Sequence, residues 1–450
     1  MRIIIVGSGT VGSAICMQLA SEGHTITIVD EDPRSLSEIA DRCDVFGVSG
    51  NGATLSTLRE AGAERADLLI AVTPGDEINI LCCAVARKLG TSHTVARVRN
   101  PEYSELMQLL QSEMNLSFTI NPELAAAKEI YRLLRFPSAT KIDTFCRGRV
   151  ELAELAVTET SPLCGATLNE LRRRISVNFL VCGVLRGETA HIPSGNFRIE
   201  AGDTVCLTAS GKDLPKLLKE LGEYRDPVRD VLIVGGSRTT YYLLDMLREG
   251  KIRSTVIERD KARCHELASS FTSTVICDNG ARPEALLEAG IENVDAFLAL
   301  SDVDEENAII SMYAKTREVG KIVTMIGSMP YVDFFKNAGL DSIVSPKTST
   351  AAQILRYVRS LANSWDSDIE SLHKIMNGEI EALEFSVRGD IEDITDIPLR
   401  ELRPRRGVLV ACIVRGKEVL IPSGDDVIHA GDTVIVVTTE RKMNSIKDIV

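Results

Sequence analysis

The sequence predicts an α/β protein in which one two-part arrangement occurs twice. Three observations support this: short β-branched runs alternate with helical stretches, a glycine-rich loop follows the first run, and the whole pattern recurs. An internal repeat sets the number of domains, so it is recognised before any element is assigned. The copies share a constant offset of 228 residues, which aligns Gly7 with Gly235, Asp30 with Glu258, and Asn51 with Asn279. We therefore expect two similar halves.

The first part of each half predicts a parallel sheet. Six apolar runs in the first copy are almost continuous, as expected for strands that helices cover on both faces. They lie at 2–7, 25–30, 44–49, 68–73, 93–98 and 116–120. We expect two Rossmann-like nucleotide-binding lobes, at residues 1–121 and 227–345.

The second part of each half predicts a smaller α+β lobe, at residues 144–226 and 372–450. It combines the helical stretch LNELRRR with alternating strands and with turns at IPSG and AGD. Linkers at 122–143 and 346–371 each contain a helix with one apolar stripe. That stripe either packs on its own lobe or crosses to a partner lobe.

Composition limits the classes of function. The chain has 450 residues, of which 44% are hydrophobic and 26% charged, and none of its apolar runs approaches the roughly 18 residues of a membrane span. We therefore expect a cytoplasmic protein without direct membrane insertion. Eleven cysteines without a C-x-x-C pair argue against a disulfide framework and a metal site. The net charge of −13 disfavours nucleic acid as a partner.

The loop GSGTVG, between a strand and a helix, predicts a phosphate-binding turn. Glycines there permit a tight turn and close approach of a pyrophosphate to the helix N-terminus. A purely structural turn is the alternative. The candidate cofactor-binding residues in this loop are Gly7, Ser8, Gly9, Thr10, Val11 and Gly12.

Further candidates lie where later strands end. Asp30 ends the second run and is placed to accept the ribose hydroxyls; its charge repels a 2′-phosphate, which favours NAD or an adenine nucleotide over NADP. Asn51 is either a binding residue or one that tolerates a left-handed turn. Thr73 follows the fourth run, and Arg97 is either a phosphate ligand or part of a surface ion pair. Asp76 is expected to cap a helix.

The second copy has a degenerate loop. Ser237 and Thr240 stand where the first copy has its second and third glycines, and their side chains should crowd a pyrophosphate and the helix–strand contact. Glu258 still offers a carboxylate and remains a candidate binding residue. We expect the second lobe to keep its fold and to weaken or lose dinucleotide binding, with a mononucleotide as the alternative.

The motifs MRIIIVGSGTVG, TIVDED, AVTPGDEIN and IPSG…AGDTV, with their order and duplication, resemble the regulators of potassium conductance (RCK) domains. The tandem layout is similar to the Trk-system potassium uptake regulatory subunits, the TrkA family, over essentially the whole chain. The resemblance implies that Gly7, Gly9 and Gly12 cradle phosphates and that Asp30 holds the ribose. It also implies that Asn51 and Thr73 contact the adenosine side and that Arg97 contacts the far phosphates.

The same resemblance implies a regulatory subunit at the inner face of the cell membrane. It would form a ring, with four chains supplying eight lobes, beneath a Trk-type potassium-translocating membrane subunit, and would gate potassium uptake. NAD(H) is the expected ligand of the first site, with ATP or ADP possible. Some relatives carry an arginine in the first glycine loop, where this chain has Thr10 and Val11, and this departure favours NAD(H).

Two other classes compete with this interpretation. A nicotinamide-dependent dehydrogenase would need a proton-transferring residue, but the chain has no Tyr-x-x-x-Lys motif and its six histidines are isolated. We therefore expect no enzyme and no catalytic residue. A soluble nucleotide-binding scaffold without a membrane partner is the remaining alternative.

Overall fold

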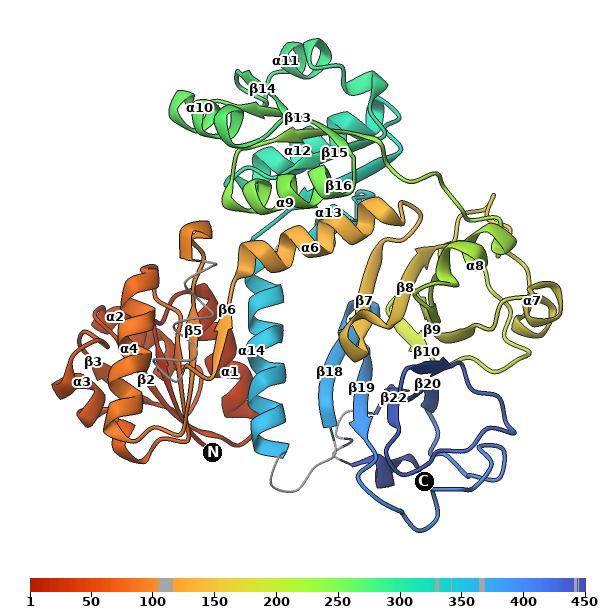
Figure 1. Ribbon diagram of the computed structural model, residues 1–450, viewed down its shortest axis with the longest axis horizontal. Coiled ribbons are helices and arrows are strands. Elements are labelled where there is room, and N and C mark those ends of the chain that lie inside the picture. The colour runs from red at the N-terminus through yellow and green to blue at the C-terminus, as the bar shows by residue number, and fades with distance from the viewer. Residues whose placement is uncertain (104–115, 328–331, 341, 364–368, 441–442, 444) are drawn as a thin grey trace. The chain divides into compact units, whose positions relative to one another are not determined.

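A computed structural model describes residues 1–103, 116–327, 332–340, 342–363, 369–440, 443 and 445–450 (Figure 1). The chain divides into two compact units. The first comprises Met1–Tyr131 and Arg229–Leu355, and the second comprises Arg132–Val228 and Arg356–Val450. Residues 364–368 of the linker expected at 346–371 lie outside the described residues.

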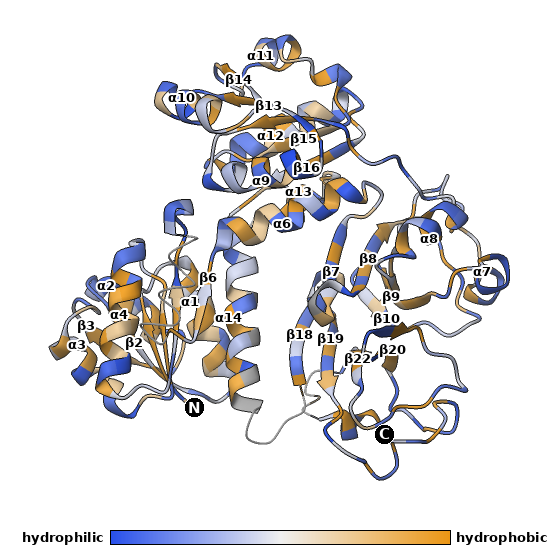
Figure 2. Ribbon diagram, viewed as in Figure 1, coloured by the Kyte–Doolittle hydropathy of each residue, from blue (hydrophilic) through white to orange (hydrophobic). Residues whose placement is uncertain are grey.

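The first lobe is built on a six-stranded parallel sheet of order β3-β2-β1-β4-β5-β6. Its strands are β1 (Arg2–Val6), β2 (Thr25–Asp30), β3 (Phe46–Ser49), β4 (Leu68–Ala71), β5 (His93–Arg97) and β6 (Phe118–Ile120). The helices are α1 (Thr10–Ser21), α2 (Pro33–Ala40), α3 (Leu55–Glu60) and α4 (Asp76–Leu89), with 3₁₀ turns η1 (Ala63–Arg65) and η2 (Pro101–Tyr103). Figure 2 shows the hydrophobic residues concentrated on these strands, and the predicted α/β class is confirmed.

The second lobe repeats this sheet in the order β14-β13-β12-β15-β16-β17. Its strands are β12 (Asp230–Val234), β13 (Arg253–Glu258), β14 (Thr274–Cys277), β15 (Ala296–Ala299), β16 (Lys321–Met325) and β17 (Ile343–Val344). The helices are α9 (Arg238–Glu249), α10 (Lys261–Ser270), α11 (Pro283–Glu288), α12 (Asp304–Thr316) and α13 (Val332–Asn337), with η4 (Ile291–Asn293). The strand order is that of the first sheet, so the duplication read from the sequence is a duplication of the fold.

The two linker helices, α6 (Pro122–Arg135) and α14 (Pro346–Asn363), contact each other through a hydrogen bond of 3.2 Å from Ser349 Oγ to Glu129 Oε2. On α6, Tyr131 packs against Gly250 at the end of α9, where a Cβ would lie 2.6 Å from its hydroxyl oxygen. Helix α6, which leaves the first lobe, therefore reaches the second lobe. Of the two alternatives for this helix, packing on its own lobe or crossing to a partner lobe, the structure shows the crossing.

The second unit contains two five-stranded antiparallel sheets of order β10-β9-β11-β8-β7 and β18-β19-β22-β20-β21. The first has β7 (Lys141–Phe145), β8 (Val150–Ala156), β9 (Leu180–Arg186), β10 (Thr189–His191), β11 (Thr204–Ser210), α7 (Leu168–Arg174), α8 (Leu214–Leu221) and η3 (Cys146–Gly148). The second has β18 (Ile369–Ile375), β19 (Ile380–Ser386), β20 (Val408–Arg415), β21 (Glu418–Leu420), β22 (Thr433–Thr438), η6 (Met376–Gly378) and η7 (Ile446–Ile449). Among the described residues from 369 onward there is no α-helix. The stretch that corresponds to α7, LRELRPR at 399–405, contains Pro404, and a proline disfavours helix in the residue before it.

The two small lobes are joined by a shared hydrophobic cluster and by reciprocal polar contacts. Glu154 on β8 accepts a hydrogen bond of 2.9 Å from the backbone N–H of Met376, and Glu384 on β19 accepts one of 3.3 Å from that of Cys146. Both pairs obey the same offset of 230 residues, so each small lobe presents the same contact to the other. This arrangement is a pseudo-twofold interface within one chain.

Asp143 on β7 faces His373 on β18 across this interface, with 3.2 Å between Asp143 Oδ1 and His373 Nδ1. Replacing Asp143 with asparagine should destabilise the interface by about 1.5–3 kcal/mol, the range for hydrogen bonds to a charged group. Burial raises the pKa of Asp143, but Lys141 and His373 lower it further, so the net pKa is below its usual range. This contribution to stability is therefore complete above the unfolded carboxyl pKa of about 4 and is lost as the pH falls below it. Urea unfolding between pH 3 and 7 measures the effect, with the exposed Asp226→Asn as control.

Candidate functional site

The glycine loop of the first lobe connects β1 to α1 and requires glycine at two positions. Gly7 has a φ of +105°, in the region that favours glycine, and its N–H donates to Val29 O at 2.9 Å. A Cβ on Gly12 would lie 1.9 Å from Gly7 O. The loop is thus held against the strand and helix that it joins.

The N-terminus of α1 is open. Gly9 occupies the N-cap position without a side-chain capping bond, and a Cβ there would have no atom within 4 Å. Thr10 and Val11 form the first helical residues, with Thr10 exposed and Val11 buried. Uncapped N–H groups of a helix and free space above the loop fit a phosphate group.

Asp30 lies at the end of β2 with its carboxylate turned to the loop. Its Oδ2 accepts hydrogen bonds of 2.6 Å from both the N–H and the hydroxyl of Ser8, and its Oδ1 accepts one of 2.9 Å from Asp32 N. Burial raises the pKa of Asp30, but the hydrogen bonds from Asp32 and Ser8 outweigh it, so the net pKa is lowered. The group therefore stays ionised at neutral pH and has the charge needed to accept ribose hydroxyls.

Thr73 and Arg97 continue the same edge of the sheet. A Cβ on Gly7 would lie 3.0 Å from Thr73 N, and Arg97 donates to Thr73 O at 2.7 Å. Burial first, and Arg99 second, lower the pKa of Arg97. Among the described residues it has no carboxylate within 4 Å and its Nε has no hydrogen-bond partner, so the predicted surface ion pair is absent there.

Asn51 follows β3 and is exposed, with its Oδ1 accepting a hydrogen bond of 2.8 Å from Ala53 N. Asn51 is not among the residues with positive φ, so the left-handed interpretation is wrong. The adjacent Gly52 allows this loop to approach β1, because a Cβ there would lie 2.2 Å from Val6 Cγ1. The structure thus places Asn51 at the edge that carries Asp30 and Thr73.

Asp76 does not cap α4, so that prediction is wrong. Gly75 is the N-cap, and Asp76 Oδ2 instead accepts hydrogen bonds of 2.8 Å from the N–H groups of Arg99 and Asn100. A carboxylate at the first helical position faces the segment after β5, and this contact is favoured over capping.

Sequence reasoning underrated Asn79. It is fully buried; its Oδ1 accepts from Thr73 N at 2.8 Å and its Nδ2 donates to Arg97 O at 2.9 Å. Asn307 bonds Ser301 and Met325 in the same way in the second lobe. The repeated D-E-x-N motif contained the signal, because a buried amide at the same place in both copies ties the ends of two strands together.

The second lobe closes its loop with its own side chains. Ser237 Oγ accepts from Thr240 N at 3.4 Å and so caps α9, while the Thr240 hydroxyl donates to Gly235 O at 2.6 Å. Glu258 Oε2 accepts a hydrogen bond of 2.5 Å from Gly236 N. The cap satisfies a helix N–H that is open in the first lobe.

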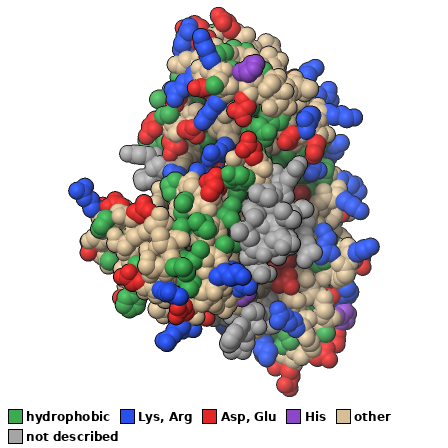
Figure 3. Space-filling model, turned by 60° about the vertical axis from the view of Figure 1, so that its left-hand side comes forward, with side chains coloured by type: hydrophobic (Ala, Val, Ile, Leu, Met, Phe, Trp, Pro, Cys, Tyr) green, Lys and Arg blue, Asp and Glu red, His purple; other side chains and the backbone are tan. Residues whose placement is uncertain are grey.

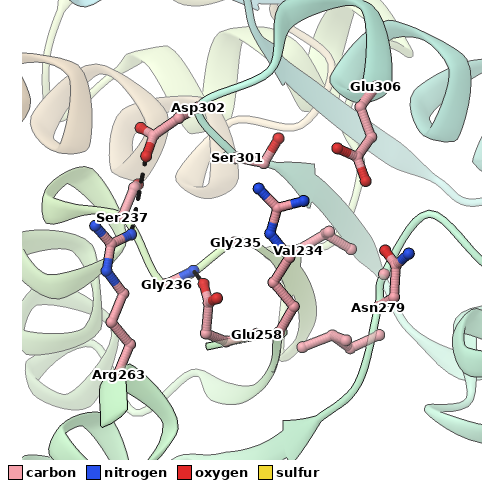
Figure 4. A pocket seen from close by; sticks show the side chains of 13 residues that line it. Val234, Gly235, Gly236, Ser237, Glu258, Arg263, Asn279, Ser301, Asp302 and Glu306 are labelled. Carbon is pink, nitrogen blue, oxygen red and sulfur yellow. Dashed lines mark hydrogen bonds and ion pairs between the residues drawn. The ribbon is translucent and has the colours of Figure 1, made fainter. Parts of the chain in front are cut away.

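A polar pocket remains above this second loop (Figure 4). Glu258 points toward Gly236, and Arg263 reaches across toward Asp302, with 3.8 Å between its Nη1 and Asp302 Oδ2. Other lining residues include Arg259, Asn279, Ser301 and Glu306. Glu258 therefore lies in a site of its own, apart from the candidates of the first lobe.

Two Rossmann-like lobes, each paired with a small antiparallel lobe, define a tandem two-lobe α/β protein. The TrkA-N domain model matches residues 3–117 and 231–346, and the TrkA-C domain model matches residues 152–222 and 394–450. The chain belongs to the TrkA family of Trk-system potassium uptake proteins, with tandem RCK domains.

Curated relatives span almost the whole chain. The chain is 34% identical to the Trk system potassium uptake protein TrkA of Halomonas elongata over 448 residues, covering 98% of this chain and 96% of that one. It is 32% identical to the Vibrio alginolyticus protein of the same name over 449 residues, with the same shares covered. The Archaeoglobus fulgidus homolog is 30% identical over 451 residues, with both chains fully covered.

Solved structures share the fold. A structure described as "GsuK Channel" matches with a TM-score of 0.64 at 18% identity, covering 97% of this chain and 76% of that one. A second, described as "GsuK channel bound to NAD", matches with a TM-score of 0.63 at the same identity and coverage. No helix among the described residues is long and apolar enough to cross a membrane.

Proposed function

We propose that this chain is a cytoplasmic nucleotide-sensing regulatory subunit that assembles under a Trk-type potassium transporter and gates potassium uptake. The observation that carries the proposal is a series of neighbouring residues beside the uncapped N-terminus of α1. Asp30 accepts a hydrogen bond from Ser8 in the glycine loop, Gly7 of that loop lies close to Thr73, and Arg97 donates to Thr73 O. Relatives named as potassium uptake proteins, and a channel of the same fold with NAD bound, support the proposal.

NAD(H) is the proposed ligand of the first site, with ATP or ADP as the competing ligands. The ionised Asp30 suits a ribose with free hydroxyls and repels a 2′-phosphate. The proposed second site is weaker, because the Ser237 side chain caps α9, whereas the N-terminus of α1 has no side-chain cap. We infer no enzymatic activity.

Nucleotide binding can influence the rest of the first unit through the contact between its lobes. Tyr242 on α9 donates to Arg99 O at 3.0 Å and accepts from Asn121 Nδ2 at 2.8 Å. Arg99 lies two residues beyond Arg97 and faces Asp76 at 3.7 Å. A ligand that moves Arg97 would therefore act on the junction with the second lobe, provided that it prefers one arrangement of the two lobes.

Assembly with other copies is supported by exposed apolar side chains on equivalent helices. Leu81 on α4 is 47% exposed, and its counterpart Ile309 on α12 is 66% exposed, with Met312 nearby at 42%. Figure 3 shows hydrophobic side chains gathered among charged ones on one face of the molecule. Large exposed apolar side chains often mark protein–protein contacts. We propose a ring of four chains, and a monomeric mass in light scattering would refute it.

The experiment that tests the function is calorimetry of the full chain with NAD, NADH, ATP and ADP, followed by potassium flux in vesicles that contain the membrane subunit. We expect one tight site per chain that prefers NAD(H), and a flux that changes with the nucleotide. If the nucleotides bind but the potassium flux is the same with all four of them, the protein is a nucleotide-binding scaffold and does not regulate transport. Two equal sites per chain would contradict the proposed inequality of the lobes.

Tyr242→Phe should separate binding from coupling. Removal of one hydroxyl costs about 0.5–1.5 kcal/mol of stability. Nucleotide affinity at the first site should stay near wild type, whereas the nucleotide-dependent change in small-angle scattering should shrink. The control is Tyr241→Phe, whose ring packs edge-on against Phe271. A scattering change equal to that of the wild type would exclude this junction as the coupling path.

A further inference from the structure

Two cysteines flank Glu258 in the second lobe. Cys264 on α10 is buried, and its thiol donates to the main-chain oxygen of Glu258 at 3.2 Å. Cys277 ends β14 and lies in register with Glu258 on the neighbouring strand β13. Cys277 thus neighbours the residue whose main-chain oxygen Cys264 contacts, and its proximity contributes to the raised pKa of Cys264. Both sulfur atoms therefore lie beside one residue of the second pocket.

This pair joins two walls of that pocket. Arg263, which precedes Cys264, lines the pocket from α10, and Asn279, which follows Cys277 by two residues, lines it from the segment after β14 (Figure 4). Helix α10 packs against β14. A covalent bond between the two sulfur atoms would hold Arg263 and Asn279 at a fixed separation.

The two thiols differ in access. Cys277 is exposed, whereas Cys264 is buried. Burial first, and the neighbouring Cys277 second, raise the pKa of Cys264 to about 12. An oxidant from solution therefore meets Cys277 first, and Cys264 is positioned to react with the product. Exposed attacking thiols next to a second cysteine are the usual arrangement of redox-sensing sites.

We propose that Cys264 and Cys277 form a reversible disulfide, a redox modification site that locks two walls of the second pocket. The oxidant is a hydroperoxide. Cys277 thiolate attacks its terminal oxygen, so an S–O bond forms, the O–O bond breaks, and the leaving oxygen takes up a proton. Cys264 sulfur then attacks the sulfenic sulfur; the S–S bond forms, the S–O bond breaks, and the Cys264 proton leaves with hydroxide as water. A dithiol reductant restores both thiols.

The first lobe offers an internal comparison. Cys16 on α1 is fully buried and lies near Cys43, which is only partly buried and contributes to the raised pKa of Cys16. Neither sulfur is as accessible as that of Cys277. This pair should therefore react later, although its two thiols also lie near each other.

The test is mild hydrogen peroxide treatment of the full-length folded protein, followed by alkylation, trypsin and mass spectrometry. No lysine or arginine lies between Cys264 and Cys277, so both fall on one peptide that begins after Arg263. We expect this peptide to lose two hydrogen atoms and to escape alkylation at both positions, before the Cys16 and Cys43 peptides change. Dithiol treatment should restore alkylation. Sulfinic acid on Cys277 with Cys264 still free to alkylate would overturn the proposal.

Two variants make the result specific. Cys264→Ser keeps a donor for Glu258 O, and in this variant Cys277 should accumulate as a sulfenic acid that a cyclic 1,3-diketone captures. Cys277→Ser should leave Cys264 unoxidised under the same conditions. The control is Cys164→Ser, which lies in the second unit and should form the disulfide as the wild type does. If Cys264 forms a disulfide with a different cysteine in Cys277→Ser, the assigned pair is wrong.

Discussion

Replacing Gly12 with alanine should destabilise the first lobe by about 3 kcal/mol or more, because the added methyl group meets main-chain atoms. Its Cβ would lie 1.9 Å from Gly7 O and 3.0 Å from Gly7 C. Gly7 cannot withdraw easily, since its N–H bonds Val29 O and its φ of +105° already needs glycine. Urea unfolding of the full chain, with hydrogen exchange of β1 and α1 as the local probe, measures the loss.

Gly9→Ala is the matched variant for this prediction. Gly9 has φ −65° and ψ −175°, which alanine adopts freely, and its Cβ would face open space. Stability should therefore stay within about 0.5 kcal/mol of wild type. Nucleotide affinity should fall about tenfold or more, since the methyl group would occupy the approach of the phosphates. Equal stability losses in both variants would refute the steric explanation for Gly12→Ala. Wild-type nucleotide affinity in Gly9→Ala would show that the phosphates do not bind at this loop.

The second copy shows where sequence reasoning about these glycines stopped. The sequence predicts that Thr240 crowds the helix–strand contact, because the first copy has glycine there. In the structure the Thr240 hydroxyl donates to Gly235 O at 2.6 Å, so a side chain is accommodated where the first loop has none. The loop backbone differs between the copies, and a residue alignment contains no information on such a shift.

The parallel sheets were predictable, since buried parallel strands require continuous β-branched runs and these runs have few alternatives. All six runs of the first copy contain the observed strands. The contact between Tyr242 and Arg99 was not predictable, because it joins residues far apart in the chain. The prediction that Asp76 caps a helix failed for the same reason. A cap is a local pattern, whereas the observed partners of Asp76, Arg99 and Asn100, lie after another strand, β5. Local chemistry was therefore readable from the sequence, and contacts between lobes were not.

Asp30→Ala should weaken nucleotide binding at the first site by about 1.5–3 kcal/mol, the range for hydrogen bonds to a charged group. This corresponds to roughly tenfold to 150-fold in the dissociation constant. Because the pKa of Asp30 is below its usual range, the carboxylate is ionised throughout pH 5–8, and its contribution to affinity should not change with pH there. Calorimetry of the full chain with NADH at two pH values in that range measures both statements.

Removal of Asp30 also frees Ser8, so the loss of affinity needs a control that separates ribose binding from loop order. Ser8→Ala deletes the hydroxyl bond of 2.6 Å but keeps the carboxylate and the backbone bond to it. If Asp30 holds the ribose, Ser8→Ala should bind NADH within about threefold of wild type, a difference below 1 kcal/mol. Glu258→Ala, the equivalent change in the second lobe, should leave the first site unchanged. Equal losses in Asp30→Ala and Ser8→Ala would assign the effect to the loop, and the ribose assignment would then be wrong.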